Sequence, residues 1–194
     1  MAPEIRTVPM TALDAHLRIP MSFTVTSIIA VQYPDHGLGG FLLTPQTVTS
    51  PYVKDYDALS GNSPHTWAQD FDLSTWGLIA AFVNGQVVGG ILVAHDSPDV
   101  HMLEGRRDLA VIWDLRVAPV ARHQGIGSRL FAAAETWVRA RACRWIKVET
   151  QNINVPACTL YARQGCTLGG INRYAYPELP EEVQFLWYKD CSAP

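Results

Sequence analysis

The stretch Arg122-His-Gln-Gly-Ile-Gly127 decides the fold, together with what lies on either side of it. An apolar run, residues 109–117, precedes it, and an amphipathic run over residues 128 to about 142 follows. This order predicts a strand, a glycine loop and a helix. Amides of such a loop and of the first helical turn lack partners inside the helix, so they form a site for an anion such as a pyrophosphate. Gly125 and Gly127 fit, because a side chain there would hold the backbone away from the ligand.

Two other phosphate-binding glycine loops do not fit these residues. No lysine follows Gly127, which excludes the Gly-x-x-x-x-Gly-Lys-Ser/Thr loop of nucleotide triphosphatases. The residue three positions after Gly127 is Leu130, which disfavours the dinucleotide-binding pattern Gly-x-Gly-x-x-Gly. Taken alone, the hexapeptide is also compatible with a strand-to-helix turn that binds no ligand.

The segment 145–165 predicts a second strand, a break and a short helix. Asn154 is a suitable N-cap, Pro156 is tolerated in a first helical turn, and Gly165 is a suitable end to the helix. Elsewhere, Asn84-Gly85 between the apolar runs 76–83 and 86–95 predicts a tight hairpin.

The remaining elements are less sharply marked by the sequence. Residues 5–8 suggest a short strand, and residues 21–31 suit either a strand or a helix. Turn residues predict loops, and alternating apolar residues predict the last two strands. The predicted loops are 33–40, 50–64 and 95–108, and the predicted final strands are 167–174 and 182–189.

The glycine loop resembles the Arg/Gln-x-x-Gly-x-Gly/Ala signature of the GNAT superfamily of N-acetyltransferases, and segment 145–165 agrees with that resemblance. Four stretches look particularly like the streptothricin acetyltransferase branch: 149–158, 168–174, 50–56 and 185–188. The resemblance extends from about Phe41 to Tyr188, and it implies an acetyl-CoA-binding core at about 76–174. The length of 194 residues suits one compact domain, so we expect a single GNAT domain over residues 1–194. The resemblance implies an α/β (α+β) fold: a mixed, mostly antiparallel sheet of six to seven strands, splayed at the acetyl-CoA site, with helices on both faces.

The resemblance also implies which residues bind acetyl-CoA. Main-chain groups of Leu115 and Val117 would pair with the pantetheine, in a gap left by a break in the strand. The pyrophosphate contacts would be Arg122, His123, Gln124, Gly125, Ile126, Gly127 and Ser128, and further contacts would be Asn152, Asn154 and Tyr161.

The chemistry of acetyl transfer needs a proton donor for the departing thiolate and a base for the amine. Tyr161 is the candidate general acid, because a tyrosine pKa of about 10 keeps the hydroxyl protonated at neutral pH. A buried structural tyrosine is the alternative. Resembling enzymes often carry a glutamate base where this chain has Trp113. Asp114 and Glu149 are the remaining candidates for the base, and a salt bridge or a strand-end hydrogen bond is the alternative for each.

Three aromatic residues are candidate contacts for the amine acceptor. Trp113 can attract an ammonium group to its ring face, or it can pack in the core. Tyr52 and Tyr56 lie in a segment expected to cover a pocket, although packed surface tyrosines explain them equally well.

Composition narrows the class of function. A net charge of -3 argues against a nucleic-acid or anionic membrane surface, and no run approaches the length of a membrane span. The four cysteines and six histidines lack metal-ligand spacing, so we expect no metal, reduced thiols and a cytoplasmic protein. A homodimer is left open.

The sequence therefore predicts an acetyl-CoA-dependent N-acetyltransferase that acts on a primary amine of a cationic small molecule, such as a streptothricin-type antibiotic. The alternatives are a protein lysine or N-terminal acetyltransferase, and a non-catalytic acyl-CoA-binding sensor.

Overall fold

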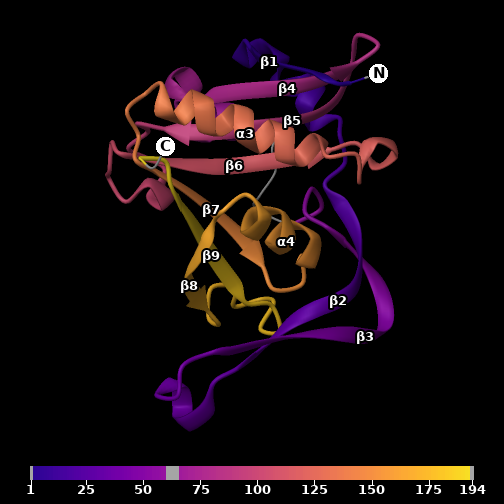
Figure 1. Ribbon diagram of the computed structural model, residues 1–194, viewed down its shortest axis with the longest axis vertical. Coiled ribbons are helices and arrows are strands. Elements are labelled where there is room, and N and C mark those ends of the chain that lie inside the picture. Colours follow the sequence, from indigo (N-terminus) through magenta and orange to yellow (C-terminus); the bar gives the residue numbers. More distant parts are fainter. Residues whose placement is uncertain (1, 60–65, 193–194) are drawn as a thin grey trace. The chain divides into compact units, whose positions relative to one another are not determined.

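The computed structural model describes residues 2–59 and 66–192 (Figure 1). The α-helices are α1 (Leu13–Leu17), α2 (Trp67–Asp70), α3 (Ile126–Arg139) and α4 (Val155–Arg163). The strands are β1 (Glu4–Val8), β2 (Ser22–Gln32), β3 (Leu42–Asp55), β4 (Gly77–Val83), β5 (Gln86–His95), β6 (Leu109–Val117), β7 (Trp145–Gln151), β8 (Thr167–Asn172) and β9 (Gln184–Asp190).

Seven strands form one mixed sheet in the order β1-β4-β5-β6-β7-β9-β8, and β2 and β3 form a separate antiparallel pair. Strands β1, β4, β5 and β6 pair antiparallel, whereas β6 and β7 are parallel. The predicted mixed, mostly antiparallel sheet of six to seven strands is confirmed.

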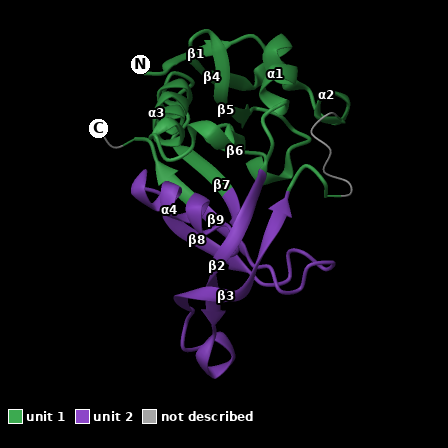
Figure 2. Ribbon diagram, turned by 90° about the vertical axis from the view of Figure 1, so that its right-hand side faces the viewer, with its two compact units in different colours: residues 1–21, 56–148, 188–194 green, residues 22–55, 149–187 purple. Residues whose placement is uncertain are grey.

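The chain separates into two compact units (Figure 2). Unit 1 comprises residues 1–21, 56–148 and 188–194, and unit 2 comprises residues 22–55 and 149–187. Strands β7 and β9 each continue from one unit into the other, so the sheet belongs to both.

In unit 1, helices cover both faces of the antiparallel sheet, as predicted, and two adjacent glycines of β5 permit it. Successive residues of a strand point to opposite faces. A Cβ atom at Gly89 would lie 3.2 Å from side-chain atoms of Ile126 and Leu130 in α3. A Cβ atom at Gly90 would lie 2.3 Å from the ring of His16 in α1. Each glycine therefore lets a helix approach the sheet closely.

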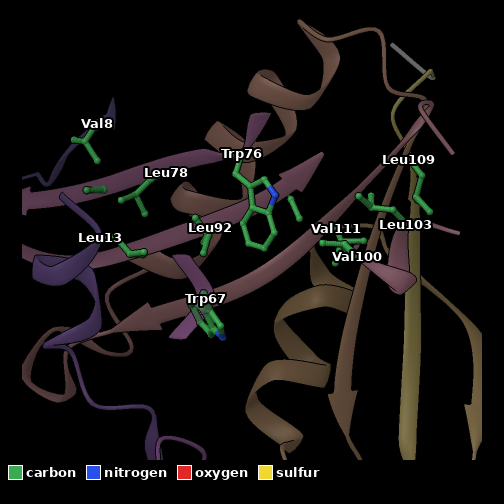
Figure 3. Close-up of a cluster of buried hydrophobic side chains, with 12 residues drawn as sticks. Val8, Leu13, Trp67, Trp76, Leu78, Leu92, Val100, Leu103, Leu109 and Val111 are labelled. Carbon is green, nitrogen blue, oxygen red and sulfur yellow. The ribbon is translucent and has the colours of Figure 1, made fainter. Parts of the chain in front are cut away.

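One cluster of buried hydrophobic side chains in unit 1 joins the sheet to α1 and α2 (Figure 3). Its members come from β1, α1, α2, β4, β5, β6, the residue just before β4 and the connection after β5. Twelve side chains make up the cluster: Val8, Leu13, Trp67, Trp76, Leu78, Ala80, Leu92, Ala94, Val100, Leu103, Leu109 and Val111. The predicted apolar stripe of the helix after the glycine loop is also confirmed, since Leu130, Phe131, Ala134, Trp137 and Val138 are all buried.

Most element predictions are confirmed, including the strand over residues 5–8. The predicted hairpin joins β4 and β5, with Asn84 at φ 51° and Gly85 at φ 76°. Residues 21–31, open between strand and helix, are the strand β2. The helix expected at 128–142 begins two residues earlier, because Gly125 of the loop is itself the N-cap. The helix ends at Arg139.

One prediction was wrong in part. Residues 50–55 were expected to be a loop, but they are the end of the 14-residue strand β3. The ladder with β2 supplies the reason, since Tyr52 is paired with Val25 and Asp55 with Ser22. Pairing to a partner some 30 positions away overrides the turn-rich local composition. Residues 56–59 of that predicted loop are turns and bends, as expected, and residues 60–64 lie outside the described residues.

Candidate acetyl-CoA and acceptor residues

The predicted break in the strand before the glycine loop is present in β6. Leu92 of β5 is paired with Asp114 and Val93 with Ile112, so Trp113 is the extra residue of a β-bulge. The parallel ladder between β6 and β7 joins Leu109–Ile112 to Trp145–Val148. Pairing with β7 therefore stops just before the bulge, at the position where the predicted pantetheine contacts, Leu115 and Val117, begin.

The glycine loop has the geometry of an anion site at the start of α3. Gly125 has φ 75°, a conformation that side chains rarely adopt, and a Cβ atom there would meet nothing within 4 Å. Arg129 donates to the Gly125 carbonyl at 3.1 Å. The amides of Ile126, Gly127 and Ser128 precede that bond, so they are the donors that an α-helix cannot satisfy internally.

Side chains of the loop hold its shape in unit 1. Arg122 Nε donates to the Val117 carbonyl at the end of β6, at 3.0 Å. Gln124 Nε2 donates to the Val120 carbonyl at 3.2 Å, and His123 has φ 61°. These contacts fix the backbone, so a pyrophosphate role for these residues rests on main-chain position and stays a prediction.

Asp114 lies on the face of β6 that α1 covers, as Trp113 does, because the bulge turns two successive side chains to one side, and there it is fully engaged. Its carboxylate contacts His16 Nε2 at 2.7 Å and Arg116 Nε at 2.9 Å. Burial by itself would raise the Asp114 pKa, but His16 and then Arg116 lower it by hydrogen bonding and charge. A carboxylate 4% exposed and held ionised by two partners favours the salt-bridge alternative over the role of base.

Arg116 extends this network to the residues that precede and follow the β2–β3 hairpin in the chain. Its guanidinium donates to the Ile19 carbonyl at 2.9 Å and contacts Asp57 at 2.8 Å. Asp57 accepts from the Met21 amide at 3.0 Å, and the Tyr56 amide donates to the Met21 carbonyl at 3.2 Å. All of these residues belong to unit 1, so it holds both ends of the segment 22–55.

Trp113 packs among aromatic rings of unit 1. Its ring centroid lies 5.1 Å from that of Phe71, 5.3 Å from Trp76 and 6.1 Å from Trp67, with edge-on or tilted geometry. These contacts favour the core-packing alternative, although the side chain is only partly buried. A contact with the acceptor stays a prediction.

In unit 2, the two predicted asparagines differ in position. Asn154 is the N-cap of α4, and its side chain accepts from the Ala157 amide at 3.2 Å. Asn152 is 3% exposed. Its side chain donates to the Ile29 carbonyl at 3.1 Å and accepts from the Val183 amide at 2.8 Å. Asn152 therefore joins three segments of unit 2, which favours a structural role over the expected cofactor contact.

Tyr161 lies in α4 and is 5% exposed. The helix ends as predicted, at Arg163, with Gly165 at φ 81°. Burial alone agrees with both the general-acid and the structural assignment, so the catalytic role stays a prediction.

Glu149 lies in the part of β7 that belongs to unit 2, where two side chains donate to it. Tyr176 donates its hydroxyl to one carboxylate oxygen at 2.7 Å, and Gln184 Nε2 donates to the other at 2.7 Å. Gln151 Nε2 in turn donates to the Tyr176 hydroxyl oxygen at 2.7 Å. Neither Tyr176 nor Gln184 could be predicted from the sequence, because contacts at separations of 27 and 35 residues leave no local signal.

The predicted acceptor tyrosines lie in different units, Tyr52 in unit 2 and Tyr56 in unit 1. Tyr52 on β3 is 42% exposed. Burial raises the Tyr52 pKa, and the carboxylates of Glu182 and Glu181 raise it further. Glu182 is buried and already ion-paired with Lys54 Nζ, so Glu181 is the carboxylate near this exposed ring that favours a cation. Tyr56 is partly buried, and its amide contacts Met21 in unit 1.

The cysteines are free and buried in the described chain. Burial raises the pKa of Cys158 to about 11, so its thiol is protonated at neutral pH. Within residues 2–59 and 66–192, no group of three or more His, Cys, Asp and Glu side chains is suited to a metal ion. No helix of that described part is long and apolar enough to cross a membrane.

The strand with a bulge, the glycine loop at the start of α3 and the asparagine-capped α4 define a GNAT fold. Residues 46–166 match the family described as the acetyltransferase (GNAT) family, and the chain belongs to it. It is an N-acetyltransferase of that family.

The chain is 34% identical to a streptothricin acetyltransferase of Escherichia coli over 86% of this chain and 84% of the relative. A protein from Bacillus anthracis str. Ames, assigned as a streptothricin acetyltransferase and solved in complex with acetyl coenzyme A, is 26% identical. Its TM-score is 0.75, with 97% of this chain and 99% of that chain covered. A nourseothricin acetyltransferase structure has a TM-score of 0.76 at 23% identity, with 98% and 99% covered, and shows the shared fold.

Proposed function

We propose that this enzyme transfers the acetyl group of acetyl-CoA to a primary amine of a cationic small molecule of the streptothricin type. The observation that carries the proposal is the 34% identity to a streptothricin acetyltransferase over 86% of the chain. Tyr52, 42% exposed and near the carboxylate of Glu181, supports a cationic acceptor. The family match runs from unit 2 through unit 1 and back, which supports one acetyltransferase domain over residues 1–194.

The glycine loop fits the pyrophosphate of acetyl-CoA. A Cβ atom at Gly125 would meet nothing within 4 Å, and the helix leaves the N–H groups of three amides at the start of α3 unused. The ladder with β7 ends at Ile112, which leaves the other edge of the β6 main chain at Leu115 and Val117 for the pantetheine. Asn154 and Tyr161 are the proposed contacts from α4. Bound acetyl-CoA would supply the activated acetyl group.

In the proposed chemistry, one residue accepts a proton and a second residue donates one. Glu149 accepts a proton from the acceptor nitrogen, directly or through water, as the new C–N bond forms. Tyr161 donates its hydroxyl proton to the sulfur as the C–S bond breaks. The amine loses one proton and the sulfur gains one, and exchange with solvent restores both side chains. Glu149 is preferred to Asp114 because the Asp114 carboxylate is already bound by His16 and Arg116.

Thiol release measured with acetyl-CoA and a panel of amines tests this function. The panel contains streptothricin, a lysine-containing peptide and a peptide with a free N-terminus. We expect turnover with streptothricin and little with either peptide. Turnover with a peptide alone would favour a protein acetyltransferase, and acetyl-CoA binding without any turnover would favour a sensor.

Two further expectations accompany this proposal. Four free, buried cysteines suit a reducing compartment, so we propose that the reaction takes place in the cytoplasm. A homodimer stays a prediction, which a measurement of molecular mass in solution tests.

A further inference from the structure

The Glu149 carboxylate has a more elaborate setting than the bare function requires. Tyr176 comes from the connection between β8 and β9, Gln184 from β9, and Gln151 from the end of β7. The three side chains converge on one strand end within unit 2, and each donor–acceptor distance is 2.7 Å. An exposed carboxylate that served only solubility would need no such partners.

The direction of the hydrogen bonds is set by the chemistry of the groups. A carboxylate accepts only, and an amide nitrogen donates only. Gln151 Nε2 therefore donates to the Tyr176 oxygen, which leaves the tyrosine proton for Glu149. Gln184 donates to the second carboxylate oxygen. The carboxylate plane is thus fixed at both oxygens.

The same arrangement leaves the Glu149 carboxylate able to accept a proton. A carboxylate has about four lone-pair sites, and these two donors occupy two of them. The side chain is only partly buried, so a proton can reach it. Tyr176 is the titratable group that faces Glu149 among these contacts, and the glutamines of β7 and β9 are neutral. No described cation neutralises the carboxylate there, in contrast to Asp114.

We infer that Tyr176 and Gln184 are positioning residues that orient the Glu149 carboxylate to accept the proton of the attacking amine, with Gln151 orienting Tyr176. This inference rests on the proposed function, and it assigns the loop between β8 and β9 a part in the reaction. The loop supplies the donor that holds the base, and the substrate need not touch Tyr176.

The test is the pH dependence of kcat and kcat/KM with acetyl-CoA and streptothricin. Tyr176→Phe removes the donor while keeping the ring, and Gln184→Leu removes the other donor. Tyr174→Phe is the matched control, because Tyr174 lies two residues away and is 83% exposed. Thermal midpoints of all variants establish that each is folded.

Loss of a donor destabilises the ionised carboxylate, so the acidic limb of the rate profile should move to higher pH. We expect a move of about one pH unit for Tyr176→Phe, and a fall in kcat of about 10- to 100-fold. Gln184→Leu should act in the same direction, and KM for acetyl-CoA should not change. Tyr174→Phe should match the wild type. A purely structural role would lower the thermal midpoint and leave the limb in place.

Three results separate failure of the inference from failure of the function. Wild-type protein that acetylates no amine would overturn the proposed function. Turnover with a Tyr176→Phe profile that coincides with the wild-type profile would overturn the inference alone. So would a Glu149→Gln variant that keeps both its turnover and its acidic limb. If Tyr176→Phe does not fold, the pH profile of Gln184→Leu is compared with the wild-type profile instead, and coincidence of the two would overturn the inference.

Discussion

Replacing Gly90 by alanine should destabilise unit 1 through a collision with one side chain. A Cβ atom there would lie 2.3 Å from His16 Nδ1 and 3.0 Å from the next ring atom, Cε1. His16 is 2% exposed and cannot move aside without giving up its 2.7 Å contact with Asp114. The clash is therefore with a ring that is held in place.

The expected magnitude follows from two costs and one gain. Overpacking a core costs about 1–3 kcal/mol, and loss of a hydrogen bond to a charged group costs about 1.5–3 kcal/mol. Restricting the unfolded chain by Gly→Ala returns about 0.4–1 kcal/mol. We expect a net loss of about 2–4 kcal/mol, which corresponds to a fall in melting temperature of about 5–15 °C for a chain of this length.

Urea unfolding of a double-mutant cycle measures the effect. In a His16→Ala background the collision partner is gone, so Gly90→Ala should cost nothing or stabilise slightly. Gly170→Ala serves as the control, because a Cβ atom there meets the flexible Leu186 side chain at 3.3 Å. An equal loss from Gly90→Ala in both backgrounds, or no loss in the wild type, would refute this reasoning.

Three further predictions concern the reaction and its acid dependence. Tyr161→Phe should lower kcat by about 10²-fold and leave acetyl-CoA binding by calorimetry unchanged; an unaltered kcat would remove the acid assignment. Gly125→Asp should abolish acetyl-CoA binding, since a carboxylate would face the pyrophosphate at a φ of 75°, and calorimetry should show no heat. The Asp114 pKa is lowered in the folded state, so its contribution to stability is present above its unfolded pKa of about 3.9 and is lost as pH falls through the folded value. Asp114→Asn should therefore be less stable than the wild type at pH 7, and the difference in urea midpoints should narrow below about pH 4; a constant difference would contradict the linkage.

Features with a local physical cause could be predicted from the sequence. The hairpin at Asn84-Gly85 needs two residues with positive φ, and the N-cap at Asn154 needs one side-chain oxygen. The glycine loop and the stripe of α3 likewise depend on neighbours in the chain. These elements lie close to where they were expected.

Features that depend on distant partners could not be predicted. The end of β3 is a strand because β2 pairs with it, although its own sequence is typical of a loop. His16 and Asp114 are 98 positions apart, so nothing near either residue indicates their contact. The same holds for Tyr176, which orients Glu149 from another strand connection. Asn152 and Trp113 suggested ligand contacts by their place in a motif, but packing and main-chain bonds engage them.

The hydrogen bonds made by Arg116 determine which changes segment 22–55 can accept. Met21 and Tyr56 are hydrogen-bonded to each other, and Ile19 and Asp57 are both fastened to one guanidinium. The 34 residues between them, 22–55, therefore begin and end at a junction whose own hydrogen bonds involve none of these residues. The hairpin also contacts Asn152 through the Ile29 main chain and Glu182 through Lys54. Substitutions in the hairpin that keep these contacts should therefore leave the junction at Arg116 intact.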